Sequence, residues 1–358
     1  MQDIQQKLTK KLISSNFSRY PASLFHRKMG LSCYFFHLSR HESNPEYYAF
    51  ADKLLDQVLL NDLSPNQHID VEDGLAGIGL GVTWLVKNRY IEADLNELLK
   101  VIDDAIFRKI AFQHNPDFFS ATHLVQLAVY LYIRLKEQAK GTDNYPSLQM
   151  DLIIKVLNRL YPKIDDDFSN ESFTFSVYDY QLPVFLWITG QLLKAGFYND
   201  KIYKMLDVLQ PRILSRFPQL HSNQLFLLWG MLSLKPFLRQ EHAQWNNYIR
   251  LLYREISLNE ILDNEITDRK IFISNGLSMI YVLLHAINTV FPEYPIPFDP
   301  QTIYDRLQHS DAWNVLIERD YFYQMHHGLI NGFPGVQLVL EHIKINYELA
   351  PPAPSKGG

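Results

Sequence analysis

Cysteine is almost absent from this sequence, with a single residue, Cys33, among 358. One thiol cannot build an internal disulfide framework, and it excludes a metal site made of several cysteines. The sequence also lacks a run of about 18 apolar residues, so we expect no membrane span. Its polar N-terminus has no apolar segment behind it, which predicts no secretory signal and a cytoplasmic protein.

Charge of one sign and strand patterns are also scarce. The net charge is only -5, so no basic field is expected to attract nucleic acid or an anionic membrane. Phosphate loops of the GxxxxGK type and Gly-x-Ser-x-Gly elbows are missing. No segment sustains the alternation of apolar and polar residues that a half-buried strand needs, so the sequence predicts an all-α fold.

What the sequence does contain is a repeated apolar stretch that opens with two glycines three residues apart. Gly74 and Gly77 begin one copy, and Gly332 and Gly335 begin another near the end of the chain. Paired glycines before an unbroken apolar run indicate close backbone approach at the start of a buried helix. Two copies so far apart indicate an internal repeat.

Each repeat unit is predicted to be an apolar helix, a turn and an amphipathic helix. The first motif position falls at residues 27, 74, 123, 181, 224, 276 and 332, which is the spacing of helical hairpins. Gly30 and Gly276 keep one glycine of the motif, whereas the units that begin at His123, Gln181 and Gln224 keep none.

The alternation of apolar and amphipathic helices predicts two layers, with the apolar helices inside. Because a closed ring hides the exposed ends of an open array, we expect the units to form one closed domain over residues 1–349. Residues 1–20 are expected to be a polar helical lead-in. The Pro- and Gly-rich residues 350–358 are expected to be a disordered tail.

The two glycine openings, Gly74-Leu-Ala-Gly77-Ile and Gly332-Phe-Pro-Gly335-Val, resemble the signature of the lanthionine synthetase C-like family. This resemblance implies an α/α toroid of seven helical hairpins, with an inner and an outer helix layer. It also implies a role in the maturation of lanthipeptide-type peptides. In the enzymes of the family, zinc activates a cysteine thiol of the substrate, which adds to a dehydroamino acid and closes a thioether ring.

The zinc ligands of the family are replaced in this sequence. Transferred by position, the two cysteines and the histidine fall on Ser222, Ser274 and Asn275, and the acid/base histidine falls on Tyr180. Neutral hydroxyl and amide groups are poor zinc ligands. The resemblance therefore implies the scaffold without the zinc chemistry, so we expect neither a metal nor another cofactor.

The polar residues at the start of the apolar helices are the candidate binding residues. If the helices form a ring, these residues share one end of it and form a polar mouth for a modified peptide or a peptide-modifying enzyme. Helix N-capping is the alternative role for such residues. The set is Asp73, Thr122, Tyr180, Asn223, Ser274, Asn275 and Asn331, with His26 in the first unit.

Two enzymatic alternatives stay open. In a metal-independent thioether cyclase, Tyr180, His326 or His327 would handle protons, and the ring would supply proximity. In a carbohydrate-active toroid, Asp73 and Asp179 would be the paired carboxylates of an acid/base mechanism. An acidic residue ahead of a helix is also a common partner of the helix dipole.

Overall fold

The computed structural model describes residues 2–17, 20–64, 67–138, 145–239 and 243–348. Within these ranges the regular elements are all helices and no residue is in a strand, which confirms the predicted all-α class. None of the helices described combines the length and the apolar character needed to cross a bilayer. The expected disordered tail, 350–358, lies outside the described residues.

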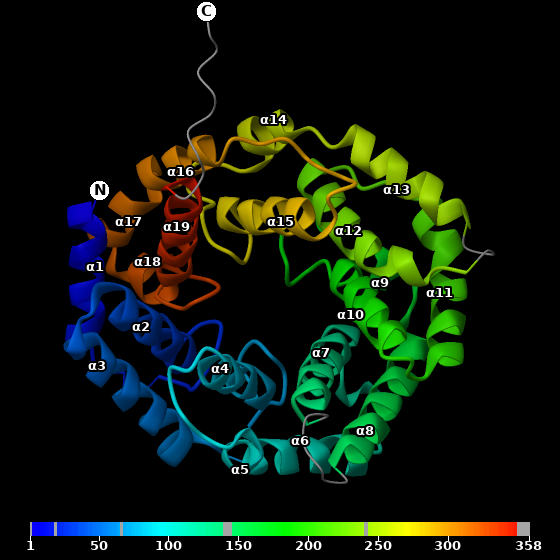
Figure 1. Ribbon diagram of the computed structural model, residues 1–358, viewed down its shortest axis with the longest axis horizontal. Helices are drawn as coiled ribbons and strands as arrows, with labels where there is room; N and C mark the ends of the chain where they lie inside the picture. Colours follow the sequence, from blue (N-terminus) through cyan, green and yellow to red (C-terminus); the bar gives the residue numbers. More distant parts are fainter. Residues whose placement is uncertain (1, 18–19, 65–66, 139–144, 240–242, 349–358) are drawn as a thin grey trace, which may run out of the picture.

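The helices are arranged in two layers around a ring (Figure 1). Each inner helix contacts the next one along the chain, and the last contacts the first, so the inner layer is a closed circuit. The inner helices are α2 (Lys28–Glu42), α4 (Leu75–Lys87), α7 (Ala121–Gln138), α10 (Leu182–Lys194), α12 (His221–Leu234), α15 (Leu277–Val290) and α19 (Phe333–Glu348).

The outer layer is made of helices that alternate with the inner ones along the chain. They are α1 (Gln2–Ser14), α3 (Pro45–Asp56), α5 (Leu95–Leu98), α6 (Lys100–Phe112), α8 (Tyr145–Leu160), α11 (Asn199–Leu214), α13 (Ala243–Glu255), α14 (Leu258–Glu260), α16 (Pro300–His309) and α17 (Ala312–Glu318). The remaining elements are short: α9 (Asp166–Ser169), α18 (Asp320–Met325) and the 3-10 or π segments Gln57–Asp62, Pro116–Phe118, Tyr161–Lys163, Lys235–Phe237 and Ile261–Glu265.

The two layers differ in how much of each helix is buried. Inner helix α12 buries nearly its whole length, from Ser222 to Leu228 and from Gly230 to Leu234. Outer helix α13 buries only Trp245, Tyr248, Ile249 and Leu252, one stripe at helical spacing. Such a stripe is what a helix with one face in the core and one face in water requires, as the sequence pattern predicts.

The N-terminal helix α1 belongs to the ring wall rather than leading into it. Its Leu8 and Leu12 are buried, and Thr9 shares a hydrogen bond of 3.3 Å with Tyr34 of α2. Lys11 Nζ forms an ion pair of 2.6 Å with Asp320, at the start of α18. The helix was expected from the sequence, but α1 joins the first and last units and completes the outer layer between α3 and α17 (Figure 1).

The motif glycines lie where the loop before an inner helix folds back onto that helix. A Cβ atom on Gly77 would overlap the carbonyl oxygen of Val71, and one on Gly335 would overlap that of Leu329. In both places the blocked carbonyl lies six residues before the glycine. The shared geometry explains why the two glycine openings are alike in sequence.

Two of the units without the glycines, those that begin at Gln181 and Gln224, hold the preceding loop with a glutamine side chain. Gln224 Nε2 donates to the carbonyl oxygen of Pro218, again six residues earlier, at 2.8 Å. Gln181 Nε2 donates to the carbonyl oxygens of Val177 and Tyr178, at 2.7 and 2.9 Å. A hydrogen bond from a side chain thus takes the place of direct backbone packing.

Candidate functional site

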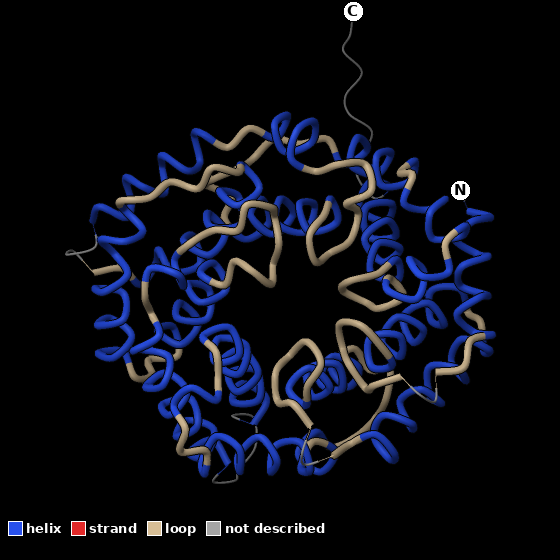
Figure 2. Tube along the Cα trace, turned by 180° about the vertical axis from the view of Figure 1, so that it is seen from behind, coloured by secondary structure: helices blue, strands red, loops and turns tan. Residues whose placement is uncertain are grey.

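The loops that lead into the inner helices meet at one end of the ring, where they point toward its centre (Figure 2). Backbone hydrogen bonds of 3.0 to 3.4 Å link neighbouring loops. The N–H of Val177 donates to Ser274, that of Ser274 to Ile330, that of Ile330 to Phe25 and that of Phe25 to Glu72. We call this set of linked loops the collar. It gathers residues from units that are far apart in sequence.

One collar loop reaches across the ring. Tyr178, just before α10, lies with its ring centroid 5.7 Å from Phe25 and 6.4 Å from His26, both just before α2. Because α4 and α7 separate α2 from α10 along one side of the ring, this contact spans the ring (Figure 1). We call Phe25, His26, Glu72, Asp73 and Tyr178 the cross-ring cluster.

Carboxylates give the cross-ring cluster its electrostatic character. Burial raises the pKa of Glu72, and the neighbouring carboxylates Asp70, Asp73 and Asp179 raise it further. Burial also raises the pKa of Tyr178, with Glu72 and Asp73 adding to the effect. Burial and neighbouring carboxylates thus act in the same direction on the pKa of Glu72, and a hydrogen bond from Gln126 acts against them.

Ser222, Ser274 and Asn275, where the resemblance would place zinc ligands, make hydrogen bonds to other polar groups. The Ser274 hydroxyl donates to Asn331 Oδ1 at 2.9 Å, and Asn275 Oδ1 lies 3.3 Å from the same hydroxyl. The backbone N–H of Ser222 donates to the Glu265 carboxylate at 2.9 Å, and the Ser222 side chain is buried. Two hydroxyls and an amide offer zinc neither a thiolate nor an imidazole, so this donor set does not fit the metal.

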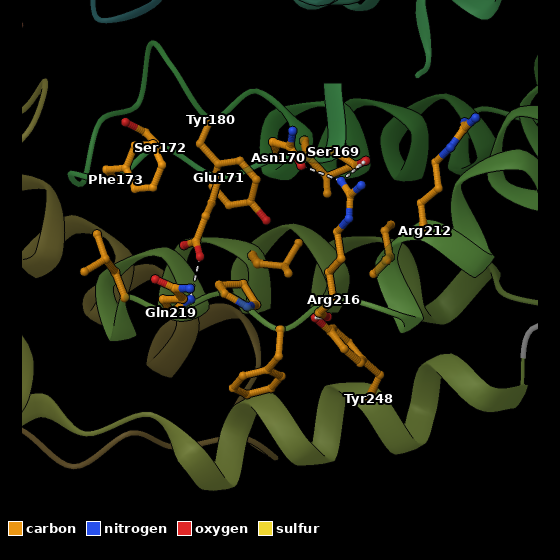
Figure 3. Close-up of a pocket in the computed structure, with 16 residues that line it drawn as sticks. Ser169, Asn170, Glu171, Ser172, Phe173, Tyr180, Arg212, Arg216, Gln219 and Tyr248 are labelled. Carbon is orange, nitrogen blue, oxygen red and sulfur yellow. Dashed lines mark hydrogen bonds between the residues drawn. The ribbon is translucent and has the colours of Figure 1, made fainter. Parts of the chain in front are cut away.

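One cavity lies between the inner and outer layers (Figure 3). It has a volume of about 530 Å³, and it is bounded by the loop after α9, the C-terminal end of α11, the start of α12 and one side of α13. We call it the wall pocket. Its lining residues include Glu171, Phe173, Tyr180, Arg216, Phe217 and Tyr248.

Most polar groups of the wall pocket already have partners. The Glu171 carboxylate accepts from the Gln219 backbone N–H at 2.5 Å and from Asn223 Nδ2 at 2.8 Å. The Tyr248 hydroxyl donates to the Arg216 carbonyl oxygen at 2.7 Å. Tyr180 is different: its hydroxyl points into the pocket (Figure 3), and none of the described residues forms a hydrogen bond with it.

The predicted binding residues fall into separate groups. Ser274, Asn275 and Asn331 lie together at the collar, and Asp73 belongs to the cross-ring cluster. Tyr180 and Asn223 both adjoin Glu171, Tyr180 in the wall pocket and Asn223 through its hydrogen bond. Thr122 lines a smaller crevice of about 350 Å³ with Asp179, between the starts of α7 and α10.

Helix capping does not account for three of these residues. Helices α4 and α15 are preceded by Gly74 and Gly276 at their N-cap positions, and α12 is preceded by Leu220. None of the three helices has a side-chain cap. The alternative role of N-caps for Asp73, Asn223 and Asn275 is therefore wrong.

The two histidines proposed for proton transfer do not line the wall pocket with Tyr180. The ring of His326 stacks on Phe272, with centroids 4.3 Å apart. His327 is buried, with Nε2 3.0 Å from an Arg27 guanidinium nitrogen. Burial lowers the pKa of His327 to about 4, and the charge of Arg27 lowers it as well. This histidine is a neutral packing group at neutral pH.

The single thiol is a core group. Cys33 lies in α2, and its Sγ approaches the Gly81 carbonyl oxygen at 3.8 Å. Burial raises the pKa of Cys33 to about 12. A thiol in such a site is inert as a nucleophile.

Sequence reasoning missed Glu171, Tyr178 and the aromatic residues Phe173 and Phe217 at the wall pocket. Phe173 is 96% exposed, which is unusual for a large apolar side chain beside a cavity. The available signal was position: Glu171, Phe173 and Tyr178 all lie in the loop before α10, the same loop that carries Tyr180.

A scan against models of known protein families finds no match to this chain, and a search of curated proteins finds none either. The geometry of the collar and the wall pocket therefore carries the functional argument.

Proposed function

We propose that this protein is an α/α toroid of seven helical hairpins, similar to the lanthionine synthetase C-like family, that binds a peptide or a peptide-modifying enzyme without zinc chemistry. The observation that carries the proposal is the collar, where polar residues from distant units meet at one end of the ring. Its role would be to hold a modified peptide, or the enzyme acting on it, in lanthipeptide-type maturation.

The geometry of the glycine openings supports the proposed family likeness. Gly77 and Gly335 occupy the same position relative to the loop that folds back over them, although they lie at opposite ends of the chain. The closed circuit of inner helices supports the proposed toroid. The replacement of thiolate and imidazole donors at Ser222, Ser274 and Asn275 supports a binding role over a zinc-dependent one.

Metal analysis tests the family likeness. We expect the purified protein to contain far less than one zinc per chain, whereas S222C/S274C/N275H should bind zinc stoichiometrically if the three positions correspond to the family's ligands. The double variant S222C/S274C is the matched control and should bind more weakly, because it lacks the imidazole. Full zinc occupancy of the natural protein, or none in the triple variant, would contradict the proposal.

Peptide binding tests the function directly. The probe is a synthetic peptide with one dehydroalanine and one cysteine, labelled for fluorescence anisotropy. We expect saturable binding of the peptide. The free thiol of the peptide should not be consumed, which alkylation of the thiol and mass spectrometry can measure. Ring closure that persists in the presence of a chelator would instead favour the metal-independent cyclase with Tyr180, His326 or His327. Absence of binding by this peptide and by the products of adjacent genes would overturn the proposal.

The cross-ring cluster gives the carbohydrate-active alternative one specific observation in its favour. Glu72 has a raised pKa and lies among carboxylates that include Asp73 and Asp179, the pair that the sequence singles out. In that mechanism Glu72 would be the acid. Hydrolysis of a panel of oligosaccharides that is lost in Glu72→Gln, Asp73→Asn and Asp179→Asn would establish it, and an inactive natural protein would exclude it.

A further inference from the structure

The wall pocket has the features of a binding site that is separate from the collar mouth. It lies between the inner and outer layers, where the loop before α10 faces α11, α12 and α13 (Figure 3). Its lining is mostly apolar and includes Leu182, Ile213, Phe217, Leu220 and Leu227. Cavities of this size take small molecules or one or two side chains of a peptide.

The Tyr180 hydroxyl forms no hydrogen bond with any of the described residues. The side chain of Tyr180 is only 2% exposed, and its hydroxyl points into the cavity (Figure 3). The hydroxyl is not among the fully buried, unpaired side-chain atoms of the described residues, so it can be reached from the pocket. A ligand that brings a hydrogen-bonding atom to this point would supply the missing partner.

The neighbouring polar groups have partners of their own. The Glu171 carboxylate is held by Gln219 and Asn223, and the Tyr248 hydroxyl by the Arg216 carbonyl oxygen. A ligand that fits the wall pocket would therefore be an apolar group with one polar atom at its end. Tyr180 itself can either donate or accept, so a partner hydroxyl fits in both arrangements.

The pocket entrance adds an aromatic surface. Phe173 is 96% exposed and Phe217 is 37% exposed, and both line the pocket. Exposed aromatic side chains beside a cavity are typical of sites that hold a ring between apolar groups.

We infer that the wall pocket binds a phenol side chain, that is, a tyrosine residue of a peptide, with its ring against Phe173 and Phe217 and its hydroxyl paired with Tyr180. The tyrosine would come from the peptide of the proposed function, and to that extent the inference rests on it. The recognition itself concerns only the phenol group, so it can be tested without the peptide.

Small-molecule probes test the inference on the full chain. N-acetyl-tyrosinamide and N-acetyl-phenylalaninamide differ by one hydroxyl, and their binding can be compared by ligand-detected NMR. The natural protein should bind the tyrosine probe about tenfold more tightly, since losing the hydroxyl leaves Tyr180 unpaired. Equal binding of the two probes, or binding of neither, would overturn the inference.

Two variants test whether Tyr180 causes the preference for the tyrosine probe over the phenylalanine probe. In Tyr180→Phe the preference for the tyrosine probe should fall to about one, and the protein should still fold because the lost hydroxyl makes no hydrogen bond. Tyr253→Phe is the matched control, as this tyrosine bonds to the Pro295 carbonyl oxygen outside the pocket and should keep the tenfold preference. A preference that persists in Tyr180→Phe would contradict the inference.

A second pair of variants tests the pocket entrance. Phe173→Ala should weaken both probes to a similar extent, because the ring contact is common to them. Phe112→Ala, which removes another exposed aromatic side chain, on outer helix α6, should change neither. Loss of binding in both variants, or in neither, would contradict a site at Phe173.

The outcomes for the pocket and for the proposed function are distinguishable. If the tyrosine probe binds through Tyr180 but no dehydrated or adjacent-gene peptide binds, the pocket stands and the proposed function fails. If such peptides bind equally well to the natural protein and to Tyr180→Phe, the proposed function stands and the pocket inference fails.

Discussion

Two parts of the ring solve the same packing problem in different ways. Around α4 and α19, glycine lets the preceding loop lie directly on the helix, as at Gly77 and Gly335. Around α10 and α12, Gln181 and Gln224 hold the loop through side-chain hydrogen bonds. The wall pocket lies beside these glutamine-opened helices. Looser loop attachment and a ligand-sized cavity thus occur in the same part of the molecule.

The comparison teaches that loss of a motif residue need not mean loss of the fold. A glycine opening is restrictive, because no side chain fits between helix and loop. A glutamine opening replaces that contact with an amide that can reach a carbonyl oxygen from farther away. The second solution leaves room for side chains such as Tyr180 to face a cavity.

The largest expected effect is at a glycine opening. Gly335→Ala places a methyl group against the Leu329 carbonyl oxygen and close to Ile273, so we expect a loss of about 3 kcal/mol or more in the free energy of unfolding. Urea denaturation followed by circular dichroism measures it. An alanine in an open helix position stabilises by up to about 1 kcal/mol, so even an unchanged stability would refute the close packing.

A smaller effect is expected from acid, and it should begin where the first and last units meet. His327 has a folded-state pKa of about 4, below its ordinary value of 6.5, because it is buried. The unfolded chain therefore binds a proton more readily, and stability is lost as the pH falls from about 6.5 to about 4. The loss attributable to this residue is up to about 3 kcal/mol.

The pH dependence can be assigned to His327 by substitution. Urea midpoints between pH 7 and pH 4.5 should change less in His327→Gln than in the natural protein. Hydrogen exchange at pH 5 should show amides of α2 and α18 opening before those of α12. Equal slopes for the two proteins would show that His327 does not govern the acid response.

The smallest effect is expected at a glutamine opening. Gln224→Ala removes the buried hydrogen bond to the Pro218 carbonyl oxygen and the hydrogen bond of 3.2 Å between Gln224 Oε1 and His221 Nδ1, for which we expect a loss of about 1 to 2 kcal/mol. The same denaturation assay measures it, with Gln219→Ala as a control at an exposed position of the same loop. If Gln224→Ala lowered the free energy of unfolding as much as Gly335→Ala does, the two kinds of opening would not differ in how tightly they pack.

The sequence predicts the helices well and the site only in part. Periodicity identifies the buried and half-buried helices, because each face of a helix must match its surroundings along its whole length. The glycines of the motif are also readable, since their requirement is local. The closing role of α1 is not, because α1 contacts α17 and Asp320, near the far end of the chain.

The site depends on contacts between loops, which no local pattern encodes. Tyr178 meets His26 only because two hairpins on different sides of the ring extend their loops toward the centre. Glu171 lies among polar residues, and its contacts with Gln219 and Asn223 come from another unit. The sequence singles out Tyr180 by position, but its place in a pocket between the layers follows from the fold of its loop.

Helix α1 also sets an order of events during synthesis. The ion pair of Lys11 with Asp320 and the contacts of α1 with α17 join segments about 300 residues apart, so this part of the wall can form only after most of the chain has left the ribosome. Until then α1 can contact α2, through Thr9 and Tyr34, but not its partners near the end of the chain. A nascent chain of this protein should therefore stay accessible to chaperones until translation is nearly complete, however early its individual hairpins fold.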